Sequence, residues 1–187
     1  MSGFEIKNLA NPLYFEDNVL PPHSDHKYYG SEAELASGCS SFKYSLNGLW
    51  HIHVARNLAE RPEGFEASDY DCHSWDTIAV PAHIQMEGYG KPHYTNTTYP
   101  WDGHEAIVPG ELPQENPVAS YVKYFAVPEG WQDLRISFQG AETALAVWLN
   151  GHFVGYSEDS FTPSDFDLTP YVQSGENKLA VQVFRFA

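Results

Sequence analysis

The sequence predicts an all-β fold of the sandwich type, and two observations support this prediction. Short segments in which apolar and polar residues alternate recur along the chain, which is the period of a half-buried strand. Turns rich in Gly and Pro separate these segments, and no amphipathic helix of any length is indicated. About seven or eight short strands joined in this way are typical of a jelly roll or an immunoglobulin-like sandwich.

Composition fits one domain and excludes several classes of partner. The chain has 187 residues, 42% of them hydrophobic, and a single domain usually has roughly 100–200 residues. Acidic residues outnumber basic ones by 25 to 10, and the formal charge is −15. Such a field repels phosphate backbones and no Lys/Arg cluster is present, so we expect no nucleic-acid partner. Without an apolar run of roughly 20 residues or a signal-peptide pattern, we expect no membrane partner and a cytoplasmic location.

Residues 1–40 are expected to form an extended N-terminal arm, followed by one domain over residues 41–187. Asn11-Pro12 and Pro21-Pro22 block helix and sheet, whereas residues 31–36 favour one or two helical turns. The arm has too little apolar content to fold alone. We therefore expect it to lie across the domain or to reach outside it.

The first expected strand follows a tight turn predicted at Asn47-Gly48 and ends near Val54. His51 and His53 share one face of this strand and could bind a metal together. Because no third ligand is evident, an exposed polar face is the better interpretation. Residues 57–73 predict a polar surface loop, and residues 75–80 resume a strand.

The second half of the chain has clearer strand patterns. Strands are predicted over residues 119–127, 134–138, 143–149, 152–156 and 178–186. Asn150-Gly151 predicts a type I′ turn within a hairpin, because both residues tolerate positive φ. Asp167 is expected to cap a short helical turn that runs through Tyr171, with Gly175 at its exit.

Paired carboxylates are the main catalytic candidates that the residues offer. Glu158-Asp159 and the Asp165/Asp167 pair lie close in sequence, and glycosidases use two carboxyl groups across the scissile bond. These acids lie among Ser, Thr and Pro, so turn and capping hydrogen bonds explain them better. No nucleophile elbow, P-loop or dinucleotide motif is present. We therefore assign no catalytic residue.

The segment from Val80 to Trp101 is the strongest candidate for a binding site. Its Gly and Pro residues fix the backbone while aromatic and amide side chains are presented, as in rigid binding loops. The Asn96 amide can bond vicinal hydroxyls, and Tyr94 and Tyr99 flank it. From the residues alone, a surface crossover that covers the sheet, with Asn96 as a turn residue, explains the pattern as well.

Residues 80–101, VPAHIQMEGYGKPHYTNTTYPW, resemble the signature segment of the glycoside hydrolase family 2 β-galactosidases. The likeness continues in SLNGLW at 45–50, ENP at 115–117, FQGAETALAVWLNGHFVGYSEDSFTPSDFDLT at 138–169 and GENKLAVQVFRF at 175–186. WLNG is shared with the glucuronidases and mannosidases of the family. YTNTTYP combined with SEDSFTPSDFDLT is more specific to β-galactosidases.

The resemblance implies a jelly roll that is similar to galactose-binding domains and that precedes a catalytic barrel. It also implies a longer, homo-oligomeric parent enzyme that hydrolyses terminal β-galactosides such as lactose with retention. The acid/base and nucleophilic glutamates would belong to the barrel, so this chain alone is expected to be inactive. Its partners would be the galactoside and the other domains of the parent chain.

The resemblance also implies individual site residues. Asn96 would contact galactose hydroxyls, with Thr97 beside it where the family often has Val. Asn11 and Glu158 would bind Mg²⁺, and the carboxylate of Glu158 suits that ion. The parent enzyme would hold Na⁺ as well, through an aspartate beyond the last strand, and neither ion need be bound by this chain alone. Ile84 departs from the family, which usually carries Trp there.

Two alternatives belong to other functional classes. The chain would be a stand-alone carbohydrate-binding module if the aromatic loop binds sugar without further domains. It would be a purely structural scaffold domain if the loop only packs against its neighbours.

Overall fold

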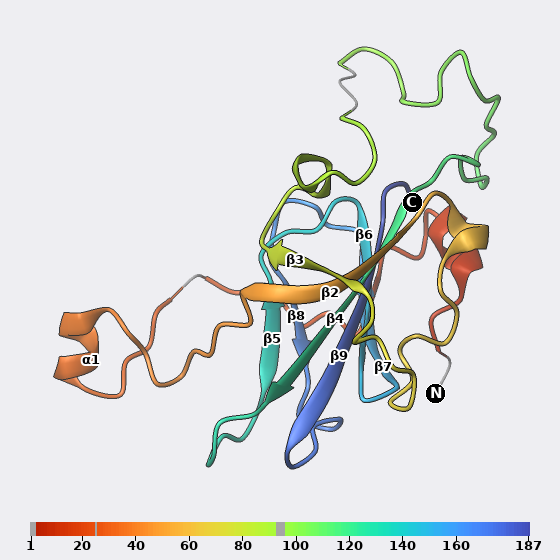
Figure 1. Cartoon of the computed structure of the whole chain (residues 1–187). Helices are drawn as coiled ribbons and strands as arrows, with labels where there is room; N and C mark the ends of the chain where they lie inside the picture. The colour runs from red at the N-terminus through yellow and green to blue at the C-terminus, as the bar shows by residue number, and fades with distance from the viewer. Residues whose placement is uncertain (1–2, 25, 93–95) are drawn as a thin grey trace.

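Seven antiparallel strands form the larger sheet of the computed structural model, which describes residues 3–24, 26–92 and 96–187 (Figure 1). In spatial order they are β1 (Glu16–Asp17), β7 (His152–Ser157), β6 (Ala144–Leu149), β9 (Glu176–Phe184), β4 (Val118–Ala126), β2 (Gly48–Ala55) and β3 (Asp76–Val80). A second sheet pairs β5 (Arg135–Phe138) with β8 (Ser164–Asp167). The prediction of an all-β sandwich is confirmed.

Helical structure in the described residues is short. One α-helix, α1 (Glu32–Ser37), follows the capping residue Ser31, and it stands away from the sheets in Figure 1. Single 3₁₀ turns cover Ile6–Ala10, Leu58–Glu60 and Ile84–Glu87. None of these segments is long and apolar enough to cross a lipid bilayer.

Both faces of the larger sheet are buried at its centre. On β9, Leu179 and Val181 face a cluster that includes Phe166 of the smaller sheet, while Ala180 and Phe184 face a second cluster on the opposite side. A strand covered on both faces needs apolar residues at consecutive positions rather than at alternate ones. This explains the long apolar run at the end of the sequence.

The N-terminal residues cover part of the second face. Leu9 is buried there, the Phe4 ring stacks on Tyr156 at 5.0 Å between centroids, and β1 pairs with β7 at the sheet edge. The beginning of the arm therefore lies across the domain.

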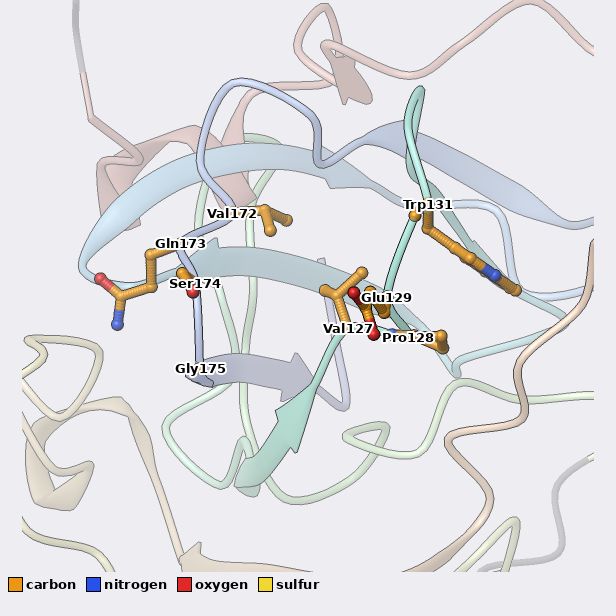
Figure 2. Close-up of a pocket in the computed structure, with 9 residues that line it drawn as sticks. Val127, Pro128, Glu129, Trp131, Val172, Gln173, Ser174 and Gly175 are labelled. Carbon is orange, nitrogen blue, oxygen red and sulfur yellow. The ribbon is translucent and has the colours of Figure 1, made fainter.

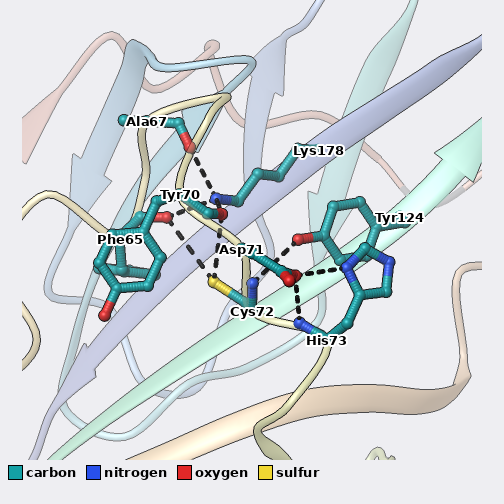
Figure 3. Close-up of polar contacts among 8 residues, drawn as sticks. All are labelled: Phe65, Ala67, Tyr70, Asp71, Cys72, His73, Tyr124 and Lys178. Carbon is teal, nitrogen blue, oxygen red and sulfur yellow. Dashed lines mark hydrogen bonds and ion pairs between the residues drawn. The ribbon is translucent and has the colours of Figure 1, made fainter.

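Residues 58–75 cover the rest of this face, and a buried lysine of β9 holds them against the sheet (Figure 3). Lys178 of β9 is 4% exposed, and its ammonium donates to the carbonyl oxygens of Phe65 at 2.7 Å, Ala67 at 2.7 Å and Tyr70 at 2.6 Å. Phe65 and Cys72 are themselves buried. The prediction of a polar surface loop is therefore wrong for these two residues.

Gly155 allows a close approach between the two sheets. A Cβ atom at this position would lie 2.5 Å from two ring carbons of Phe166 on β8 and 2.7 Å from the carbonyl oxygen of Asp17 on β1. Since Phe166 is fully buried, its ring cannot turn into solvent without losing that burial. The glycine is required for this contact.

The remaining turn predictions have mixed outcomes. The hairpin turn at Asn150-Gly151 is confirmed, with φ values of 53° and 83°. The prediction of a turn at Asn47-Gly48 is wrong, because Gly48 already pairs with Val80 as the first residue of β2. The helical turn after Asp167 is present as a single turn, because the Tyr171 and Val172 amides both donate to the Leu168 carbonyl, at 2.9 and 3.2 Å. Asp167 ends β8, and its carboxylate accepts a hydrogen bond from the Thr169 amide in a local turn.

Candidate functional site

The segment between β3 and β4, residues 81–117, rises from one end of the sandwich beside the C terminus (Figure 1). Its first part is fixed to the core, since Ile84 and Tyr89 pack against the cluster between the two sheets. The Tyr89 hydroxyl also donates to the Asp76 carboxylate at 3.4 Å. Burial, followed by the nearby Asp76 charge, raises the pKa of this tyrosine, so it remains a neutral donor.

The last part of the segment is fixed to the end of the chain. Asn116 is fully buried, its amide donates to the Phe186 carbonyl at 2.9 Å, and its side-chain oxygen accepts from the Phe186 amide at 3.0 Å. Glu105 closes the preceding turn by accepting from the Gln114 and Glu115 amides at 2.7 and 3.1 Å. The sequence does not predict this role of Asn116, although the residue lies in the ENP motif.

The predicted sugar-binding residues lie between these two fixed parts. Asn96 and Thr97 are exposed, and their side chains make no hydrogen bond to other residues that the structure describes. The Asn96 amide therefore keeps its full donor and acceptor capacity for a ligand. Tyr94, the other aromatic residue named beside it, lies outside the described residues.

Two aromatic rings follow Asn96 in the same segment. Tyr99 stacks on Trp101 with centroids 5.1 Å apart and planes 6° from parallel. Trp101 in turn meets Phe186 edge to face at 5.3 Å. The Tyr99 amide donates to the Asp102 carboxylate at 2.9 Å, which fixes the backbone of the pair.

The structure brings together the segments that carry the predicted magnesium ligands. The Glu158 amide donates to the Phe15 carbonyl at 3.0 Å, so residues 11–17 run beside the end of β7. Glu158 is half-buried, it accepts the Tyr156 hydroxyl at 2.5 Å, and burial raises its pKa. Asn11 is exposed, and its side-chain oxygen accepts the Leu13 amide at 3.1 Å.

The other acidic and histidine candidates have local partners. Asp159 accepts the Phe161 and Thr162 amides at 2.9 Å each, and hydrogen bonds led by the Thr162 hydroxyl hold its pKa below the usual range. His51 packs against His73 at 5.5 Å, whereas His53 packs against Trp75 at 5.4 Å. Within residues 3–24, 26–92 and 96–187, no group of three His, Cys, Asp or Glu side chains is arranged to hold a metal.

A hollow on the described surface lies beyond the end of β4 that points away from the 81–117 segment (Figure 2). It has a volume of about 570 Å³ and is lined by residues 127–131 and 172–175. In Figure 2 the side chains of Trp131 and Gln173 point away from each other. Strand β4 lies between this hollow and the end of the segment, and its nine residues span roughly 27 Å at the usual rise per residue. It contains none of the predicted site residues.

Known proteins with similar sequences identify the family of this chain. The model of the family described as glycosyl hydrolases family 2, sugar binding domain, matches residues 43–187. A β-galactosidase from Halalkalibacterium halodurans is 56% identical over 181 residues, which cover 95% of this chain and 18% of that enzyme. The β-galactosidase large subunit of Leuconostoc lactis is 48% identical over 192 residues, covering 95% of this chain and 30% of the subunit.

Solved structures show the same fold. A β-glucuronidase from Bifidobacterium dentium superposes with a TM-score of 0.53 at 24% identity, covering 74% of this chain and 19% of that one. A β-glycosidase from Bacteroides vulgatus superposes with a TM-score of 0.53 at 27% identity, covering 73% of this chain and 16% of that one. This chain thus corresponds to less than a third of each of these four proteins. It belongs to the sugar-binding domain family of the family 2 glycosyl hydrolases.

Proposed function

We propose that this chain is the non-catalytic sugar-binding domain of a β-galactosidase and that its 81–117 segment forms one edge of the galactoside site. One observation carries the proposal: an exposed Asn96, whose side chain makes no hydrogen bond within the described part of the chain, is presented by a segment that is fixed to the core on both sides. The 56% identity to a β-galactosidase supports the choice of galactosides over other sugars.

The chemistry of the segment suits a neutral sugar. The Asn96 amide offers two donors and an oxygen acceptor, and adjacent sugar hydroxyls can use both kinds of group. Thr97 adds a hydroxyl beside it. The acid/base and nucleophilic carboxylates of a retaining glycosidase would come from other domains or subunits of the assembled enzyme. Two relatives that are β-galactosidase large subunits are consistent with such an assembly.

In the full-length enzyme, Asn96→Ala is expected to lower kcat/KM for lactose by roughly 3- to 100-fold. The estimate takes one or two lost hydrogen bonds at about 0.5–1.5 kcal/mol each. Steady-state kinetics on purified enzyme measure it. Asn47→Ala, which removes an exposed amide outside the segment, is the matched control and should stay within about twofold. An Asn96 variant with the control's kinetics would remove this residue from the site.

We also propose that Asn11 and Glu158 hold Mg²⁺. Their amide and carboxylate oxygens are the donors that this hard cation prefers, with water and other oxygen groups completing its shell. The half-burial of Glu158 fits the site, because a bound cation would offset the desolvation of the carboxylate. When bound, the ion would supply positive charge that holds residues 11–17 against the end of β7.

Millimolar Mg²⁺ is expected to raise the Tm of this chain, and Glu158→Ala is expected to abolish the increase. Burial raises the pKa of Glu158, so protonation competes with the cation, and the increase should fade as pH drops through that raised value. Calorimetric melts with and without MgCl₂ test this. Glu16→Ala, an exposed carboxylate on β1, is the control that should keep the increase. Equal responses in both variants would show only nonspecific ion effects.

A further inference from the structure

We propose that the ring of Tyr99 is the stacking surface for the group that is joined to galactose in the substrate, the aglycone. The proposal rests on the proposed function, because it takes the galactose to lie at Asn96. It assigns the neighbouring binding position to a residue that lies three positions later in the same segment.

The exposure of Tyr99 shows which part of the ring is available. One face is covered by the parallel ring of Trp101 at 5.1 Å, yet the residue remains 66% exposed. Since the covered face cannot supply that exposure, the opposite face is open to solvent. An open aromatic face stacks on the apolar C–H face of a sugar or on another aromatic ring.

The ring is held in place before any ligand arrives. Asp102 accepts the Tyr99 amide, Trp101 supports the ring from behind, and Phe186 supports Trp101 edge to face. Buried Asn116 binds the backbone of Phe186 through two hydrogen bonds. A side chain fixed in this way loses little conformational freedom on binding, so more of its contact energy appears as affinity.

Reach and charge define the group that would fit. Three residues span at most about 11 Å of extended chain, so Tyr99 can contact a group that adjoins a sugar at Asn96. The carboxylate of Asp102 accepts the backbone amide of Tyr99, and the chain carries a formal charge of −15. A neutral sugar or aromatic group is therefore favoured, and an acidic aglycone is disfavoured.

The test compares three substrates in the full-length enzyme: lactose, a nitrophenyl β-galactoside and methyl β-galactoside, which has almost no aglycone. Tyr99→Ala is expected to lower kcat/KM for lactose or the nitrophenyl galactoside, relative to methyl β-galactoside, by about 5- to 15-fold. Loss with one substrate only identifies the aglycone, sugar or aromatic, that the ring takes. Tyr99→Phe, which keeps the flat ring, should retain the wild-type ratios, whereas Tyr99→Leu should lose them.

Asn96→Ala separates this inference from the proposed function, because it should lower kcat/KM for all three substrates by the same factor. If Tyr99→Ala also lowers all three equally, Tyr99 only supports the segment and the inference is overturned. The inference is also overturned if Tyr99→Ala and Tyr99→Leu both keep the wild-type ratios of kcat/KM between the three substrates. If Asn96→Ala has no effect while Tyr99→Ala still changes the ratios, the proposed role of Asn96 fails and the stacking role stands.

Discussion

Lys178→Met is expected to lower the free energy of unfolding of this domain by about 3–5 kcal/mol. The methionine fills similar space but removes three charge-assisted hydrogen bonds to the carbonyls of Phe65, Ala67 and Tyr70. Each bond of this kind contributes about 1.5–3 kcal/mol, and partial hydration of the freed carbonyls offsets some of the loss. The Tyr70 ring, 5.6 Å from the ammonium, loses a cation–π contact as well.

Urea unfolding of the purified chain measures this loss. The urea concentration at the midpoint should fall while the m-value, the slope of the free energy against urea concentration, stays unchanged. Lys123→Met is the matched control, because its ammonium makes one exposed hydrogen bond, to the Leu49 carbonyl at 2.8 Å. We expect the control to lose less than about 1 kcal/mol. If the two variants were equally stable, the three carbonyl contacts would not be what holds residues 58–75.

Gly155→Ala is expected to destabilise the domain by about 3 kcal/mol. The added methyl group would overlap Phe166 at 2.5 Å and the Asp17 carbonyl at 2.7 Å, so β1 or β8 must move away from β7. Part of the cost is therefore the packing of the smaller sheet on the larger one. Thermal unfolding measures the change, and loss of protection from hydrogen exchange at β1 would locate it.

Two other glycines make a graded control series for this substitution. A Cβ at Gly3 would meet nothing within 4 Å, and one at Gly140 would lie 3.1 Å from the Ser160 carbonyl. Stability should fall in the order Gly3→Ala, Gly140→Ala, Gly155→Ala. Any other order would mean that backbone freedom in the unfolded chain, rather than overlap, dominates the three substitutions.

The strands of the second half were predictable because alternation and turn chemistry act locally. All five predicted strands occur within two residues of their predicted ends, and the Asn150-Gly151 turn has the expected positive φ angles. The two short strands β1 and β8 were missed. Each has only a few residues, and each is a strand because of its partner, β7 or β5, rather than because of its own pattern.

The candidate site was predictable in its residue types but not in its geometry. The presence of Gly, Pro, Asn and aromatic residues pointed to a binding segment. That Asn116 fixes Phe186 some 70 positions later is a tertiary contact without a local signal, and the stacking of Tyr99 on Trp101 depends on side-chain orientations that their spacing does not set. Lys178 was hidden for a related reason, since a charged residue at the start of an apolar strand is normally read as its exposed end.

The position of β9 has a consequence for synthesis of the protein. This strand comes last in the domain, yet it lies at the centre of the larger sheet, hydrogen-bonded to β6 on one side and β4 on the other. Until it leaves the ribosome, β7 and β6 have no connection through the sheet to β4, β2 and β3. At about 5–20 residues per second, the nascent chain holds two unpaired strand edges for seconds before the sheet can close. During this interval the unpaired edges of β6 and β4 are open to pairing with another chain.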